Sequence, residues 1–286
     1  MPPARPLELA SKRLTGWLNW HLHRGRGALL AHARDALVAD IAAQAPDHVA
    51  VTGDLVNLAL AAEFAPAAEW LTGLGAPADV SLVPGNHDAY VPGALARAIS
   101  HWGPHMRGDS ADAPEFPYLR RRGPVALVGV SSAIATAPFL ATGRVGGNQL
   151  CRLHDILHQL GTEGAARVVL IHHPPTAGTA RRAARLTDAA ALRTVLQQTG
   201  AELVLHGHTH RADLGWLPGP GAAIPVVGVP SASLAPTATR RGAGWNLLAI
   251  EGRPGAWTIT RSERGFPPAG HAIVELSRTR LAPPDS

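Results

Sequence analysis

The chain has 286 residues, of which 46% are hydrophobic and 16% charged, and its formal charge is +5. This composition is too apolar for a disordered chain, and a single cysteine, Cys151, excludes a disulfide-stapled scaffold. No apolar stretch approaches the roughly 20 residues of a membrane-spanning helix, and the N-terminus lacks the hydrophobic centre of a signal peptide. We therefore expect a cytoplasmic protein with no membrane partner.

From residue 28 to residue 205, the sequence alternates between helical and β-like segments. Apolar residues recur at helical spacing in five stretches, and short β-branched runs lie between them. Helices are predicted at Ala28–Gln44, Ala61–Leu74, Gly93–His101, Asn148–Leu160 and Asp188–Gln198, and strands at His48–Thr52, Val80–Val83, Val125–Val130, Val168–Ile171 and Leu203–Leu205. This alternation favours βαβ units, so we expect an α/β protein with largely parallel strands.

Beyond residue 210 the pattern changes to strands joined by Gly- and Pro-rich turns. These strands are predicted at Ile224–Val229, Trp245–Glu251, Trp257–Arg261 and Ala272–Leu276. We expect them to form an antiparallel sheet that closes the fold. The Pro-rich segment Gly103–Pro124 is predicted to be a surface loop, and Pro283–Ser286 a frayed tail. Because no repeat or low-complexity linker divides the chain, we expect one domain over residues 1–286, with its core at about residues 28–262.

Polar motifs come directly after four of the predicted strands. They are Gly53-Asp54, Gly85-Asn86-His87-Asp88, His172-His173-Pro174-Pro175 and Gly207-His208-Thr209-His210. Ligands of open α/β sheets bind beyond the carboxyl ends of the strands, so these four turns are predicted to converge on one crevice. They would bring a carboxylate, an amide and several imidazoles together.

This mixed set of oxygen and nitrogen donors suits borderline divalent ions such as Mn, Fe or Zn better than Ca or Mg. Each motif alone has a plain alternative. Gly53-Asp54 is a common turn signal, His172-His173 is also compatible with a packed core pair, and the other two motifs with polar loops. The position of all four at the ends of predicted strands favours a shared metal site.

In this order, the four motifs resemble the calcineurin-like metallophosphoesterase superfamily, in particular its bacterial cyclic-nucleotide phosphodiesterase-like branch. The resemblance covers about residues 28–251. It implies a four-layer αββα sandwich of mixed sheets flanked by helices. It also implies two divalent metal ions, bridged by an aspartate and a hydroxide, in a hydrolase that cleaves phosphodiesters or phosphomonoesters through a metal-bound hydroxide.

The resemblance also implies a role for each motif residue. Asp54 would bridge both metals, and His210 would belong to the second site; the ligands that complete the first site would be Asn86, His172 and His208. His172 is preferred to His173 because the family ligand lies two residues before a proline. His87 would contact the phosphoryl oxygen or protonate the leaving group, and Asp88 would orient it.

One motif of the family, Asp-x-His on the first strand, is absent. The segment Leu14–Trp20 resembles the stretch directly after that motif in some bacterial members, so we expect a late start site or a truncation that removed the first strand. His21 and His23 have the spacing of ligands on one strand face, but the tryptophans around them favour a helix and a loop. The second metal site then keeps Asp54 and His210, for which weak occupancy is expected.

The leading hypothesis is therefore a metal-dependent phosphoesterase that acts on a small phosphate ester. A DNA-processing nuclease of the same superfamily is one alternative, although scattered arginines alone support a nucleic-acid partner. A catalytically impaired metal-binding module is the other, because one ligand motif is missing. His154 and His158 are interpreted as a solvated helix edge and Cys151 as a small core residue, and the oligomeric state stays open.

Overall fold

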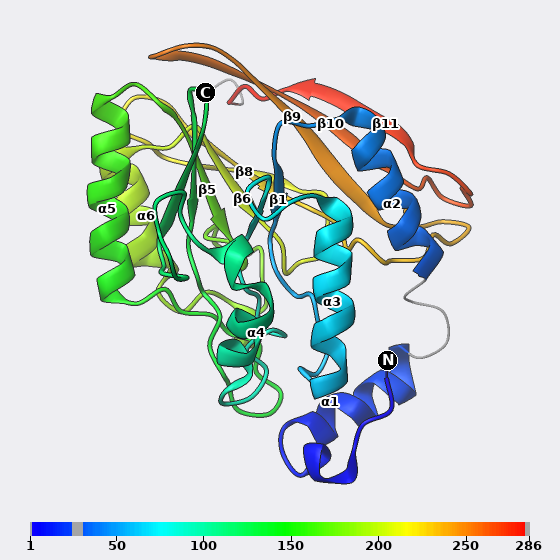
Figure 1. Cartoon of the computed structure of the whole chain (residues 1–286). Coiled ribbons are helices and arrows are strands. Elements are labelled where there is room, and N and C mark those ends of the chain that lie inside the picture. Colours follow the sequence, from blue (N-terminus) through cyan, green and yellow to red (C-terminus); the bar gives the residue numbers. More distant parts are fainter. Residues whose placement is uncertain (1, 25–30, 284–286) are drawn as a thin grey trace.

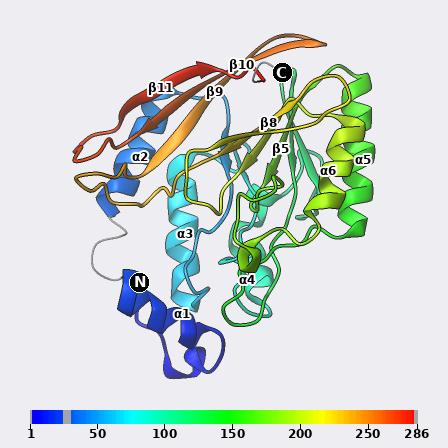
Figure 2. The same cartoon turned by 180° about the vertical axis from the view of Figure 1, so that it is seen from behind.

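The protein folds into two facing β-sheet layers with helices on both outer faces (Figures 1 and 2). The structure is a computed structural model, and it describes residues 2–24 and 31–283. This arrangement confirms the predicted sandwich of two sheet layers between helical layers. None of the helices in the described ranges is both long and apolar enough to cross a membrane.

The larger sheet has six strands in the order β3-β4-β5-β6-β8-β7. Their bounds are β3 Tyr118–Arg122, β4 Val125–Gly129, β5 Ala166–Ile171, β6 Leu203–His206, β7 Leu214–Leu217 and β8 Ile224–Gly228. The four inner strands run parallel, and the edge strands β3 and β7 are antiparallel to their neighbours. Parallel pairing places the carboxyl ends of β5 and β6 at the same edge of the sheet.

Two helices, α5 (Gly147–Thr162) and α6 (Ala189–Thr199), cover the outer face of this sheet (Figure 1). Each presents leucines at helical spacing to the strands, with Leu153, Leu157 and Leu160 on α5 fully buried. The sequence therefore forms helices here because one apolar stripe can be buried against the sheet. Cys151 on the same helix is exposed, so the prediction of a core cysteine is wrong: its position lies outside that stripe.

The second sheet layer consists of two separate sheets. The parallel pair β1 (Val49–Val51) and β2 (Val80–Leu82) lies beside the antiparallel set β9 (Gly244–Arg253), β10 (Ala256–Gly265) and β11 (Val274–Arg280). The helices on the outer face are α2 (Ala31–Gln44), α3 (Ala61–Leu74) and α4 (Ala94–Trp102). Apolar side chains from both layers, such as Leu170 of β5 and Ile259 of β10, fill the space between them.

The structure corrects three predictions about strands. The predicted loop Gly103–Pro124 contains the short helix η3 (Gly103–Met106) and the strand β3, whose Arg120 is only 3% exposed. Strand β7 was not predicted. The strand predicted at Ile224–Val229 does not join the C-terminal antiparallel sheet: as β8 it pairs in parallel with β6. The loop was predicted from the prolines of the segment, and the three arginines of β3 give no apolar pattern that would indicate a strand.

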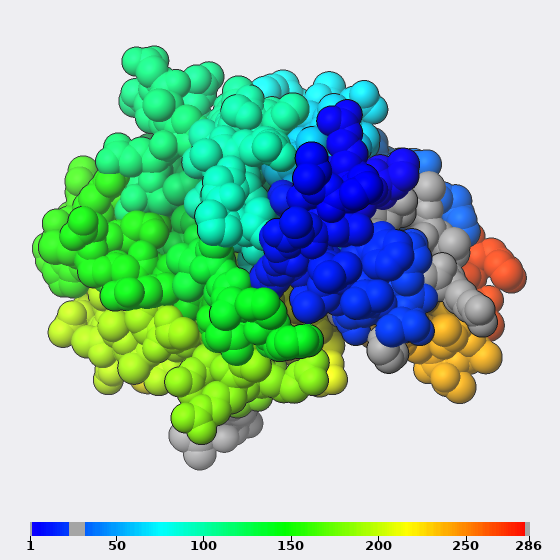
Figure 3. Space-filling view, turned by 90° about the horizontal axis from the view of Figure 1, so that it is seen from below, coloured from blue at the N-terminus to red at the C-terminus, as the bar shows by residue number. Residues whose placement is uncertain are grey.

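Residues 2–24 cover part of the lower surface of the molecule, dark blue in Figure 3. They form the helix η1 (Pro6–Leu9), the helix α1 (Arg13–Asn19) and the π-helical turn η2 (Trp20–Arg24). The Lys12 ammonium donates to Thr136 and to the Leu140 carbonyl, and the Arg13 guanidinium donates to the carbonyls of Leu58 and Ala59. His21 lies in η2 and is helical. The side chain of His23 lies outside the described part of the chain, as do residues 28–30 of the first predicted helix and residues 284–286 of the predicted tail.

Candidate metal centre

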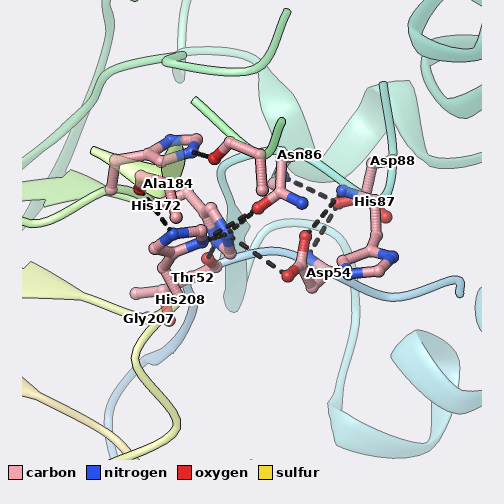
Figure 4. A network of polar contacts seen from close by, with 12 residues as sticks. Thr52, Asp54, Asn86, His87, Asp88, His172, Ala184, Gly207 and His208 are labelled. Carbon is pink, nitrogen blue, oxygen red and sulfur yellow. Dashed lines mark hydrogen bonds and ion pairs between the residues drawn. The ribbon is translucent and has the colours of Figure 1, made fainter. Parts of the chain in front are cut away.

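The turns after β1, β2, β5 and β6 meet at one edge of the sandwich, as predicted. The helix η4 (Arg182–Ala184) reaches the same region, where the Ala184 carbonyl contacts the ring of His208. Side chains of Asp54, Asn86, His172 and His208, one from each turn, point toward one another (Figure 4). Four segments distant in sequence therefore deliver their polar groups to one place.

Contacts of hydrogen-bonding length link the atoms at the centre of this group to their neighbours. His172 Nε2 is 3.2 Å from Asn86 Oδ1 and 3.3 Å from Asp54 Oδ2. His208 Nδ1 is 2.9 Å from the same Asn86 oxygen and 3.2 Å from His172 Nε2. We call these four atoms the acceptor cluster: Asp54 Oδ2, Asn86 Oδ1, His172 Nε2 and His208 Nδ1.

Backbone carbonyls fix the tautomers of the two imidazoles. The Thr52 carbonyl lies 2.6 Å from His172 Nδ1, and the Ala184 carbonyl lies 2.7 Å from His208 Nε2. A carbonyl can only accept, so each of these ring nitrogens carries the proton of the neutral imidazole. The opposite nitrogens then present lone pairs to the centre, where all four atoms are acceptors. A cation bound at the centre, or a proton on His172 Nε2, removes the repulsion among them, and carbonyl-anchored imidazoles are typical of metal ligands.

The charges of the cluster depend on burial and on Asp54. Burial and the neighbouring His172 together lower the pKa of His208 to about 4, so this ring is neutral near pH 7. Burial also lowers the pKa of His172, but the Asp54 carboxylate outweighs this and raises it. For Asp54, the two imidazoles of His172 and His87 outweigh burial and hold the pKa well below its usual range. A negative carboxylate therefore faces the centre.

His172, His173 and His208 form a group of three neighbouring imidazoles, but the ring nitrogens of His173 have different partners. Its Nε2 donates to the Ala141 carbonyl at 3.1 Å, and its Nδ1 lies 2.8 Å from the Ser132 hydroxyl. Both ring nitrogens thus have protein partners, and burial holds the pKa of this ring well below its usual range. His173 packs against the rings of His172 and His208, which supports them from behind.

Asp88 holds the backbone of the turns. Its fully buried carboxylate accepts the N–H groups of Asp54 at 2.9 Å and Gly85 at 2.8 Å with one oxygen, and those of Leu55 and Val56 with the other. Burial and the Asp54 charge raise its pKa to about 6. The expectation that Asp88 orients His87 is wrong, because the carboxylate is directed at backbone donors.

His87 is positioned by other groups. Its Nδ1 contacts the Asn57 carbonyl, and its ring stacks on Tyr90 with centroids 5.6 Å apart. Its backbone N–H donates to Asp54 Oδ1 at 2.9 Å, which turns Oδ2 of that carboxylate toward the acceptor cluster. With Nδ1 donating to a carbonyl, the other ring nitrogen is the one available to a ligand.

A cavity of about 530 Å³ opens beside the cluster and is lined by Asp54, Asn57, His172, His208 and His210, among others. His210 is exposed at this cavity, and the group of three clustered imidazoles does not include it. Sequence reasoning did not find the carbonyls of Thr52, Asn57 and Ala184. A backbone carbonyl has no side-chain signature, so the sequence carries no signal for these contacts.

A double β-layer between helices, with a carboxylate, an amide and imidazoles gathered at the strand ends, defines a metal-dependent hydrolase of the metallophosphoesterase class. The sequence profile of the calcineurin-like phosphoesterase family matches residues 22–212. The chain belongs to this family. It is a hydrolase of phosphoric ester bonds that depends on divalent metal ions and acts on small phosphate esters.

Two similar proteins extend this comparison. A probable cyclic nucleotide phosphodiesterase of Synechococcus sp. is 26% identical over 236 residues, which are 81% of this chain and 82% of that protein. The crystal structure of a dimetal phosphatase from Danio rerio covers 86% of this chain and 88% of its own, with a TM-score of 0.56 and 15% identity. The second likeness supports the fold alone.

Proposed function

We propose that the acceptor cluster binds one divalent cation, with Mn, Fe or Zn as the candidates. The observation that carries this proposal is the convergence of four acceptor atoms, two of which are nitrogens of imidazoles whose other nitrogen donates to a backbone carbonyl. One carboxylate oxygen, one amide oxygen and two imidazole nitrogens suit a borderline metal ion. When bound, such an ion polarises a phosphoryl group and lowers the pKa of a water molecule.

We propose that His87 acts on the substrate directly. Because the Asn57 carbonyl accepts the hydrogen bond of Nδ1–H, the other ring nitrogen, Nε2, is the one that faces a phosphoryl oxygen or a leaving group. Asp54 accepts the backbone N–H of His87 and so links this ring to the cation site. A positioned proton donor of this kind contributes roughly 10²- to 10⁴-fold in rate.

The proposed reaction is the hydrolysis of a small phosphodiester, and cyclic nucleotides are the first substrates to test because the Synechococcus relative carries that description. A second cation would have Asp54 and His210, both of which line the cavity, as its proposed ligands. Two ligands favour weak binding of that ion. A metal-binding protein with impaired turnover is therefore the second candidate function.

Turnover of bis-(p-nitrophenyl) phosphate and of 3′,5′-cyclic AMP, measured with Mn²⁺ alongside the metal content, tests these proposals. Asp54→Asn is expected to lose both metal and turnover. His87→Gln is expected to keep its metal and to lose about 10²- to 10⁴-fold in kcat. His158→Gln, on the exposed face of α5, is the matched control.

The two candidate functions give different outcomes. Metal binding without turnover in the wild-type protein would select the impaired module. Turnover that survives Asp54→Asn would reject the proposed centre, and so would a His158→Gln variant as damaged as His87→Gln.

A further inference from the structure

Residues 8–16, in the N-terminal segment, contact both supports of the His87 ring. One support is the Tyr90 ring, on which the imidazole stacks with an angle of 15° between the ring planes. The other is the Asn57 carbonyl, which accepts the Nδ1–H of the imidazole. These supports hold the ring at one face and at one edge, so the displacement of either one would change the direction of Nε2.

Lys12 holds the Tyr90 ring. Its ammonium nitrogen lies 4.6 Å from the centroid of this ring, which is a cation–π contact. Two further contacts fix the ammonium, because it donates to Thr136 Oγ1 at 2.6 Å and to the Leu140 carbonyl at 2.8 Å. The partly buried lysine therefore ties the Tyr90 ring to the loop between β4 and α5.

Helix α1 contacts Tyr90 and the turn after β1 at the same time. A Cβ at Gly16 would overlap the Tyr90 hydroxyl and the side chain of Leu58, so the helix fits here only with glycine. The next residue, Trp17, packs against the core cluster that contains Leu58 and Tyr90. Helix α1 therefore lies directly on the ring that supports His87, with no space for a methyl group between them.

Arg13 and Glu8 hold the turn after β1, next to the carbonyl that anchors the imidazole. The guanidinium donates to the carbonyl of Leu58 at 2.9 Å and to that of Ala59 at 2.6 Å. The Glu8 carboxylate accepts the backbone N–H of Ala61, at the start of α3, at 2.9 Å. A cation and a carboxylate of the N-terminal segment thus fix the chain directly after the second support.

We infer that Lys12, Gly16 and Tyr90 are positioning residues for His87, which set the direction of its imidazole and act on the reaction through it. The inference rests on the proposed role of His87. Misplacement of a catalytic group by about 1 Å can cost about 100-fold in rate, so supports in direct contact with the ring are able to control it. A purely structural role predicts losses that do not depend on His87, whereas a positioning role predicts losses that require it.

The ring resonances of His87 test this geometry without substrate or metal. In ¹H–¹³C NMR spectra of the full chain at one fixed pH, the His87 signal is the one that disappears in His87→Gln. Tyr90→Leu removes the stacked ring and should shift this signal. Gly16→Ala and Lys12→Met are expected to shift it in the same direction, because each displaces or releases the Tyr90 ring. The matched control is Gly73→Ala on α3, whose added Cβ makes only an ordinary contact, and it should leave the signal in place.

Double-mutant cycles on kcat test the action through His87. With bis-(p-nitrophenyl) phosphate and Mn²⁺, Lys12→Met and Gly16→Ala are expected to lower kcat by roughly 10- to 100-fold and to leave KM and the metal content nearly unchanged. Lys12→Arg keeps a cation over the ring and should retain most of the rate. In a His87→Gln background neither substitution should lower kcat further, because the group that they position is gone.

The two measurements separate this inference from the proposed function. An unshifted His87 signal in Gly16→Ala or in Lys12→Met would overturn the assignment of the residue that was changed, and this result requires no turnover. Losses of kcat as large in the His87→Gln background as in the wild type would also overturn the inference, because the N-terminal segment would then act on folding or on the metal centre. If His87→Gln itself keeps the wild-type kcat, the proposed role of His87 fails, whereas the resonance shift still decides whether the segment positions the ring.

Discussion

The substitution Asn86→Ala tests whether the acceptor cluster binds metal. It removes the oxygen that lies 2.9 Å from His208 Nδ1 and 3.2 Å from His172 Nε2. Changes in the outer contacts of a metal site typically alter its affinity by about 10- to 100-fold, so the loss of a ligand atom is expected to raise the Kd by about 100-fold. At a Mn²⁺ concentration near 100 times the wild-type Kd, this removes about 2.3 kcal/mol of metal-dependent stabilisation.

Thermal unfolding with and without Mn²⁺ measures this quantity. For 286 residues the entropy of unfolding is about 0.6 kcal/mol per degree, so the Mn²⁺-dependent rise in Tm is expected to shrink by about 4 °C. With a chelator present, the Tm of Asn86→Ala should differ little from that of the wild type, because the substitution also removes one acceptor atom from a crowded group of acceptors. The matched control is Asn148→Ala, at the exposed start of α5. An unchanged Mn²⁺ response in Asn86→Ala, or an equal loss in Asn148→Ala, would refute the assignment.

Three further predictions concern the scaffold. Burial, with nearby arginine charges, lowers the pKa of His48 to about 4, so the unfolded chain takes up the proton first below pH 6.5. Stability should then fall between pH 6.5 and 4, by about 1–2 kcal/mol more than in His48→Gln in denaturant titrations, after allowance for partial exposure. Gly85→Ala places a Cβ against the carboxylate and backbone of the facing turn and should cost about 3 kcal/mol, whereas Gly147→Ala, with open space around it, should not destabilise, as measured by urea unfolding. Arg120→Met leaves five carbonyls without the guanidinium that binds them and should lower the Tm through a loss of about 3–5 kcal/mol, while exposed Arg121→Met should change the stability by less than about 0.5 kcal/mol.

The helices were predictable because their stability depends on local signals. The helix predicted at Ala61–Leu74 has the same bounds in the structure. Its third residue, Glu63, accepts the backbone N–H of Leu60 at 2.8 Å and of Leu58 at 3.0 Å, which fixes the start of the helix. Gly75 comes directly after its end. Local capping and spacing were sufficient here.

Strand β3 shows where local signals fail. Arg120 is buried there because its guanidinium donates to the carbonyls of Pro77, Val80, Pro104 and Arg107, which lie far from it in sequence. Such partners compensate the desolvation of a charge, but they exist only after folding. An arginine-rich run therefore reads as solvated although the folded chain buries it. The same limit applies to β8, whose sheet is chosen by its neighbour β6.

The candidate metal centre likewise has features that the sequence predicts and features that it does not. The sequence shows which strand ends carry Asp54, Asn86, His172 and His208. Because ligands of α/β sheets bind beyond the carboxyl ends of the strands, these residues are predicted to meet. The sequence does not show which ring nitrogen each histidine presents, because that depends on backbone carbonyls from other turns. The pairing of Asp88 with His87 was implied by the family resemblance, whereas in the structure the amides of residues 54–56 and 85 donate to the Asp88 carboxylate.

The backbone of the centre shows why these residues occupy its turns. Asp54 and His208 have left-handed conformations, with φ of 61° and 64°, which cost about 1–2 kcal/mol for a residue with a side chain. Turn geometry alone would select glycine at both positions. At Asp54 the hydrogen bonds that three successive N–H groups donate to the Asp88 carboxylate stabilise this conformation, and at His208 the Ala184 carbonyl holds the ring. The strain is therefore retained where a side chain must reach the acceptor cluster, and the buried charge of Asp88 is explained by the backbone that it holds in place.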